Sequence, residues 1–161
     1  MEINISISIS DVLNRIHSFS AYTGAKEINI NGEDSYKRIS TITADEPILK
    51  DNLYESFSDL ESVLGKYNPN IDNTSDKVNL KLVMPSNFDT KVTAALKDVL
   101  RDYYVSAILY RWFQITNKHD AEACLQRANS YLVGIRRLLS RRVAPNRTPP
   151  REIKYTRTKF E

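Results

Sequence analysis

The chain has 161 residues, 41% of them hydrophobic, which suits one domain with a buried core. Four glycines and six prolines exclude a collagen-like or low-complexity chain, and the single cysteine, Cys124, excludes an intrachain disulfide. The start lacks the pattern of a signal peptide, and no apolar run has transmembrane length. We therefore expect a soluble intracellular protein, or one assembled inside a cell.

The net charge of +3 is unevenly divided along the chain. Residues 127–161 hold ten Lys/Arg against two Asp/Glu, whereas residues 1–126 hold thirteen against eighteen. The C-terminal part is therefore strongly basic. This asymmetry predicts that the C-terminal end binds an acidic partner, either nucleic acid or an acidic protein surface.

Two stretches have the alternating pattern of β-strands with one buried face. Isoleucines occupy every second position in residues 2–9, and apolar residues alternate similarly in residues 78–84. We expect the two stretches to pair as a small two-stranded element, within one chain or between copies. Residues 71–77 are polar and predict a loop.

Helical periodicity predicts three longer helices and one short one. The short helix covers residues 11–21 and is ended by Gly24, followed by a polar, irregular stretch to residue 43. A longer helix begins at Asp45 or Glu46, with Pro47 in its first turn and an acidic outer side. It ends at residues 68–70, Asn-Pro-Asn.

Residues 86–142 predict two long antiparallel helices joined at residues 116–118. Ser86 or Asn87 is the expected cap of the first helix. Beyond Tyr103 its apolar stripe widens to include Trp112, so this helix is either central to the core or covered by a partner. The fold class is thus mainly α: a helical bundle with a long hairpin and a small β element.

The expected domain organisation is a single helical domain over residues 1–142 and an extended basic arm over residues 143–161. Three prolines disfavour a helix after residue 142. Ile153, Tyr155 and Phe160 indicate that the arm docks on a partner, since purely solubilising segments lack aromatic residues.

No catalytic, cofactor or metal motif is present in the sequence. The two histidines, His17 and His119, lie in no recognisable catalytic or metal-binding setting, and the four glycines are isolated. Cys124 lies on an apolar helical seam, as a small core residue does. We expect a non-enzymatic protein that uses no cofactor, although an enzyme with an unrecognised site stays an alternative.

The arginine cluster at the end of the last helix is the sharpest positive feature. It is either a solvated end that complements the helix dipole, or a contact for carboxylates of another subunit or nucleic-acid phosphates. The candidate partner-binding residues are Arg136, Arg137, Arg141, Arg142, Arg147, Arg151, Tyr155 and Trp112.

A long helix that ends in Tyr110-Arg111-Trp112-Phe113 and a protruding C-terminal arm give this chain the layout of a known protein class. It resembles the neck proteins of tailed bacteriophages, the head–tail connector or adaptor class. Residues 11–26 are also similar to small structural proteins encoded in prophages.

The resemblance implies a virion protein, assembled in the host cytoplasm, that forms a homo-oligomeric ring and contacts portal or tail proteins. Its arm would reach onto neighbouring subunits. The alternative function is a nucleic-acid-binding accessory protein that uses the same arginines on phosphates without base specificity.

Overall fold

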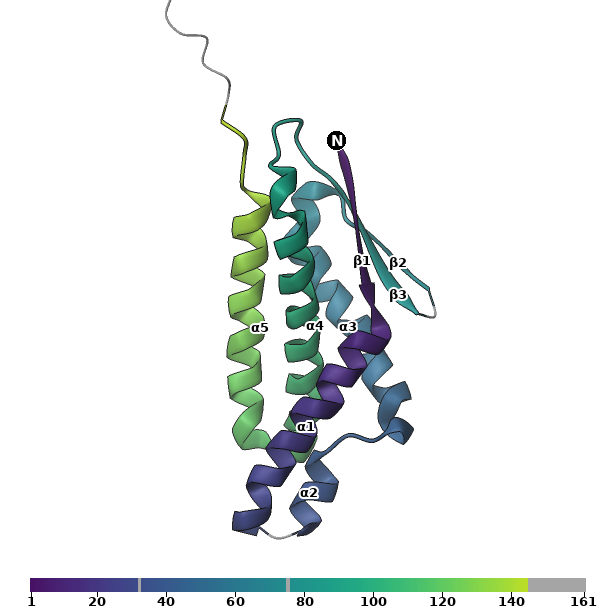
Figure 1. Cartoon of the computed structure of the whole chain (residues 1–161), viewed down its shortest axis with the longest axis vertical. Coiled ribbons are helices and arrows are strands. Elements are labelled where there is room, and N and C mark those ends of the chain that lie inside the picture. Colours follow the sequence, from purple (N-terminus) through teal and green to yellow (C-terminus); the bar gives the residue numbers. More distant parts are fainter. Residues whose placement is uncertain (32, 75, 145–161) are drawn as a thin grey trace, which may run out of the picture.

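The computed structural model describes residues 1–31, 33–74 and 76–144. Long helices run side by side, and a small antiparallel sheet packs against one end of them (Figure 1). The fold is mainly α with a small β element, as the sequence predicts. The predicted arm lies almost wholly outside the described residues, which end at Ala144.

The sheet has the strand order β1-β3-β2. The predicted pairing is confirmed within one chain: β1 (Glu2–Ser8) runs antiparallel to β3 (Lys77–Val83), with Ile5 opposite Leu80. The isoleucines of β1 share the buried face with Val78, Leu80 and Leu82 of β3, because alternate side chains of a strand lie on the same side.

A third strand, β2 (Asn70–Asn73), pairs with the other edge of β3. The sequence predicted only two strands, so β2 was missed. Ile71 is half-buried, and the other residues of β2 are exposed and polar. Such a strand has no alternating apolar pattern. Its backbone pairing with β3 defines it.

The prediction of a short first helix was wrong. Helix α1 (Ile9–Asn31) continues past Gly24, and α2 (Glu33–Ile39) follows it where an irregular stretch was expected. Gly24 is buried inside α1, and a Cβ atom there would lie 3.0 Å from Cδ2 of Tyr36 in α2. The glycine therefore permits a close approach of two helices and does not end one.

Helix α3 (Glu46–Leu64) confirms the predicted position of Pro47 in a first turn. Its end is also as predicted. A short 3₁₀ turn (Gly65–Tyr67) follows α3, and Asn68 adopts a left-handed conformation with φ of 45°. Asparagine tolerates this region better than most residues, which is why it suits the end of a helix.

The predicted hairpin is present as α4 (Thr93–Thr116) and α5 (Lys118–Leu139), separated by Asn117 as expected. The expected cap at Ser86 or Asn87 was wrong, because α4 begins later, after a 3₁₀ turn (Thr90–Val92). The Asp89 carboxylate accepts a hydrogen bond of 3.1 Å from the Lys91 amide at that turn. The residues before the turn pair with the chain beyond α5, at the bridge between Phe88 and Arg142.

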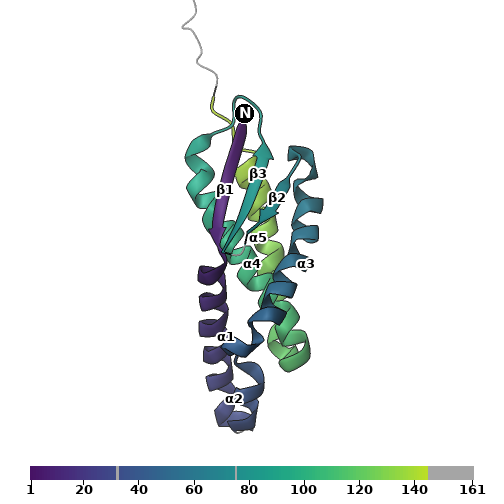
Figure 2. The same ribbon diagram turned by 90° about the vertical axis from the view of Figure 1, so that its right-hand side faces the viewer.

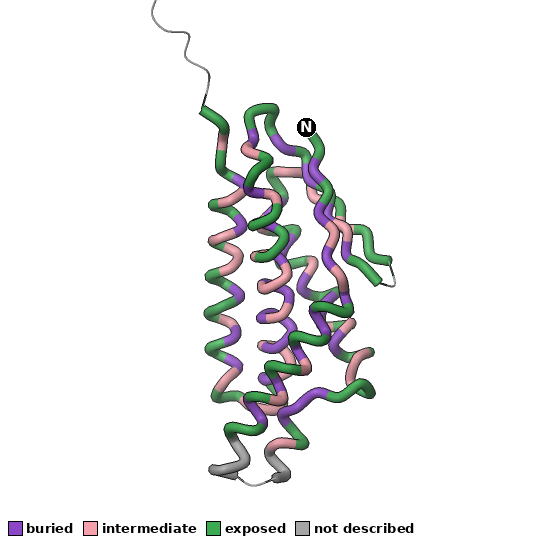
Figure 3. The backbone as a smooth tube through the Cα atoms, viewed as in Figure 1, coloured by how far each residue is buried: buried purple, intermediate pink, exposed green. Residues whose placement is uncertain are grey.

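Helix α4 lies at the centre of the bundle, against α1, α3, α5 and β1 (Figure 2). Its wide apolar surface is covered by these elements, and buried positions follow one another along it (Figure 3). Tyr103, Tyr104 and Phe113 are among the largest fully buried side chains. Of the two alternatives for the aromatic half of this helix, the core is therefore the one observed.

Candidate protein-interaction surfaces

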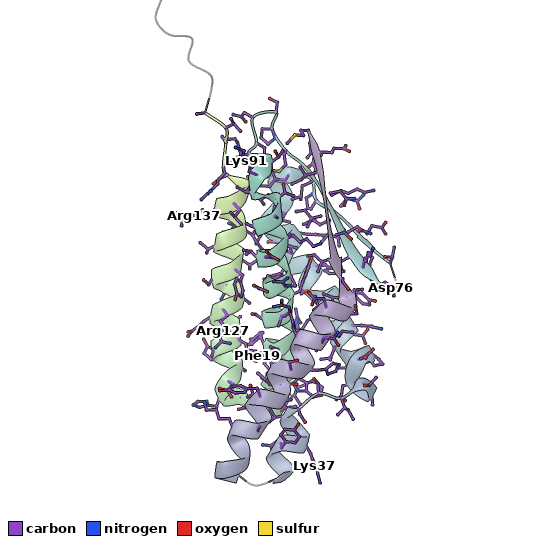
Figure 4. The ribbon with its side chains drawn as sticks, viewed as in Figure 1. Phe19, Lys37, Asp76, Lys91, Arg127 and Arg137 are labelled. Carbon is purple, nitrogen blue, oxygen red and sulfur yellow. The ribbon has the colours of Figure 1, made fainter. Side chains whose placement is uncertain are left out.

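Three of the predicted arginines form an exposed basic surface, which we call the basic end. Arg136 and Arg137 lie in the last turn of α5, and Arg141 follows the helix (Figure 4). Lys91, in the 3₁₀ turn before α4, is also exposed and lies at the same end of the molecule. Within residues 1–31, 33–74 and 76–144, none of these cations forms a salt bridge.

Arg142 differs from the three arginines of the basic end because its guanidinium group donates hydrogen bonds to backbone carbonyls of its own chain. Its Nη1 atom donates to the carbonyl oxygens of Leu139, at 2.7 Å, and Arg141, at 2.9 Å. A cation at this position satisfies free carbonyls at the end of α5 and complements the helix dipole. The structure thus gives Arg142 a role within the fold. Arg147, Arg151 and Tyr155 lie outside the described residues.

Trp112 is half-buried, and its indole is bonded inside the chain. The Nε1–H group donates a hydrogen bond of 2.8 Å to the carbonyl oxygen of Ile39, at the end of α2. A role for Trp112 in partner binding stays a prediction. In the structure, the Trp112 indole links α4 to α2.

An acidic face covers the outer side of α3, as expected from the sequence. Asp51, Glu55, Asp59 and Glu61 are all exposed. Arg111 of α4 bonds to Glu55 and lies 3.4 Å from Asp59. One arginine neutralises only part of this face, so it keeps a net negative charge.

A groove of about 770 Å³ lies between α1 and α5, with α4 as its floor. We call it the α1–α5 groove. Its apolar part is formed by side chains from all three helices: Phe19, Tyr22, Val105, Leu109 and Tyr131. The guanidinium carbon of Arg127 lies 5.3 Å from the centre of the Phe19 ring, so a cation–π contact joins the two walls (Figure 4).

One end of the α1–α5 groove is charged. Asp11, Arg15 and Asp102 line it, and Arg101 joins the last of these to Asp98 through contacts of 3.2 and 3.1 Å. Arg15 also lies 3.7 Å from Asp102. Two carboxylates, Asp11 and Asp102, and one guanidinium group, Arg15, line this end, so the lining there has a net negative charge.

Three titratable groups are buried in the helical bundle. Burial raises the pKa of the Tyr103 phenol to about 12, and the nearby Asp59 carboxylate adds to this rise. Burial also raises the pKa of Tyr104 and that of the Cys124 thiol, which lies beside the α1–α5 groove. Because its pKa is raised, Cys124 stays a protonated thiol at neutral pH, which is less reactive than the thiolate.

The two histidines lie in different surroundings. His17 Nδ1 lies 2.7 Å from the Thr41 hydroxyl, in a contact that holds the chain after α2, whereas His119 is exposed at the start of α5. In the part of the chain that the structure describes, no three His, Cys, Asp or Glu side chains are grouped as metal ligands. None of the described helices combines the length and apolar character needed to span a bilayer.

The chain was compared with protein-family models, curated proteins and solved structures, and nothing matches in any of the three. Its surfaces must therefore be interpreted from their own geometry.

The α1–α5 groove was not predicted from the sequence. The pattern places Phe19 on the buried stripe of the first helix, but the structure leaves this side chain 37% exposed and Tyr22 73% exposed. Two aromatic residues three positions apart, one turn beyond the buried Ile16, were the available signal. Periodicity alone does not show which apolar positions a neighbouring helix covers.

Proposed function

We propose that this chain is a non-enzymatic virion assembly protein, a subunit of a homo-oligomeric ring in the neck or tail of a tailed bacteriophage. It would assemble in the host cytoplasm and contact portal or tail proteins. The observation that carries the proposal is the separation of charge on one small body. Exposed arginines gather where the chain leaves the fold, and exposed carboxylates cover α3.

Opposite charges on separate faces of one subunit favour contacts between copies, because the basic end of one meets the acidic face of the next. Arg136, Arg137 and Arg141 are exposed, and arginine binds carboxylates through two parallel hydrogen bonds. The basic segment that follows them would extend the same contact. Heterologous contacts of this kind close into a ring when the rotation between copies permits it.

The test measures the mass of the full-length chain in solution and its presence on assembled particles. The double variant Arg136→Glu/Arg137→Glu is expected to assemble less. Lys37→Glu/Arg38→Glu is the matched control, because it reverses two exposed charges on α2, away from the basic end (Figure 4). A wild-type chain that stays strictly monomeric and binds no particle component would contradict the proposal.

A second candidate function is non-specific binding of nucleic acid. The excess of eight positive charges over residues 127–161, with exposed arginines at its start, is the observation that favours it. It predicts binding to DNA of any sequence that weakens steeply with added salt. Absence of binding at low salt would eliminate this candidate, whereas the ring proposal does not require DNA.

A further inference from the structure

The α1–α5 groove is partly lined by exposed aromatic side chains. Tyr22 is 73% exposed and Phe19 37% exposed, beside the half-buried Val105 and Tyr131. Removing exposed aromatic surface from water is favourable, so a partner that covers these side chains is stabilised in the groove. The Asp11 and Asp102 carboxylates at the charged end add an electrostatic contribution that favours a cationic group there.

Residues 145–161 have the composition that this groove requires. They contain three large apolar side chains, Ile153, Tyr155 and Phe160, separated by cationic ones. Five Lys/Arg against two Asp/Glu give this segment a net charge of +3, opposite in sign to the charged end of the groove. At roughly 3.3 Å per residue, 17 residues span up to about 56 Å. That reach is enough for an adjacent copy.

The path of the last described residues favours a groove on another copy. The Val143 amide donates a hydrogen bond of 2.9 Å to the carbonyl of Asn87, and the chain runs on past the end of α5 (Figure 1). The aromatic part of the groove lies beside the opposite half of α5, at Arg127. To enter its own groove, the chain would have to reverse its direction within residues 145–152, where Pro145, Pro149 and Pro150 restrict the backbone.

We propose that the α1–α5 groove binds residues 153–160 of a neighbouring copy. Tyr155 and Phe160 would pack against Phe19 and Tyr22, and the intervening cations would face the carboxylates at the charged end. This inference rests on the proposed assembly of copies and names the surface that receives the arm. The basic end of α5 and the arm would then make two separate contacts between subunits.

The test uses two double variants of the full-length chain. Phe19→Ser/Tyr22→Ser alters the groove, and Tyr155→Ser/Phe160→Ser alters the arm. Each is expected to weaken self-association at least about tenfold, measured by analytical ultracentrifugation. Ile115→Ser is the control: it removes an apolar side chain that is 84% exposed on α4 and lies outside the groove, so it should leave association unchanged. Circular dichroism verifies that every variant is folded.

Mixing the two double variants gives the decisive result. The groove variant keeps an intact arm and the arm variant keeps an intact groove, so an equimolar mixture should form a 1:1 complex more tightly than either variant associates with itself. No complex in the mixture would overturn the inference. Assembly that is lost in the arm variant but retained in the groove variant would overturn the groove and leave the proposed function standing.

Two further outcomes separate the remaining possibilities. A monomeric wild-type chain whose Cys124 reacts faster with a thiol reagent in the arm variant would place the segment in its own groove and overturn the inference. Wild-type assembly that neither double variant weakens would also overturn it, although the chain would still be a ring subunit through other contacts.

Discussion

The indole N–H of Trp112 and the carbonyl of Ile39 are joined by a hydrogen bond of 2.8 Å across 73 positions of sequence. Ile39 is buried and ends α2, so this bond fixes the α1–α2 pair against the central helix α4. A side chain that the sequence suggests for partner contact thus has a defined role inside the fold.

Trp112→Phe is expected to lower the free energy of unfolding by about 1–3 kcal/mol, because it leaves a buried carbonyl without its partner. Urea denaturation monitored by circular dichroism measures the change. Tyr110→Phe serves as control: its hydroxyl bonds only to the exposed Gln114, and its removal should cost less than about 0.5 kcal/mol. Equal effects of the two variants would argue against a structural role for the indole bond.

Gly24→Ala and Gly65→Ala are expected to have opposite effects on stability. At Gly24 the new Cβ would lie 3.0 Å from Cδ2 and 3.3 Å from the carbonyl oxygen of Tyr36, so α2 must move, at a cost of about 1 kcal/mol or more. At Gly65 nothing lies within 4 Å and the backbone is right-handed helical, so alanine should stabilise by about 0.4–1 kcal/mol. Thermal unfolding compares the pair, and stabilisation by both would show that α2 does not approach α1 so closely.

Adjacent tyrosines in α4 should respond differently to loss of their hydroxyls. The Tyr103 hydroxyl donates a hydrogen bond of 3.2 Å to Ser56, whereas the Tyr104 hydroxyl is buried and has no partner among the described residues. Tyr103→Phe should therefore cost about 1 kcal/mol, and Tyr104→Phe should be neutral or stabilising. Denaturant unfolding of both variants decides this, and a clear loss in Tyr104→Phe would reveal a bonded hydroxyl.

Alkaline pH should destabilise the protein through Tyr103. Its pKa is about 12 in the folded chain and about 10 when unfolded, so the folded state retains the phenolic proton more strongly. The protonated Tyr103 phenol contributes fully to stability below pH 10, and this contribution is lost as the pH rises from about 10 to 12. Between about pH 10 and 12 the free energy of unfolding should fall less steeply with pH for Tyr103→Phe than for the wild type. An equal pH dependence in the two proteins would contradict the role given to Tyr103.

Elements whose signals are local and repeated could be predicted from the amino-acid pattern alone. Alternating isoleucines specify β1, and 3.6-residue periodicity specifies α3, α4 and α5 together with the breaks at Asn68 and Asn117. The exposed arginines at the end of α5 were also predictable, because charge remains in water unless a partner compensates its burial.

Which apolar surfaces remain exposed depends on how the elements pack together. Gly24 marks a close helix crossing, since a Cβ atom there would press on Tyr36, a residue twelve positions away. The aromatic half of α4 became core because neighbouring helices cover it, whereas Phe19 and Tyr22 stayed exposed because α5 packs on α4 and leaves a groove beside α1. Coverage of an apolar side chain depends on how distant elements pack, and local periodicity does not encode that packing.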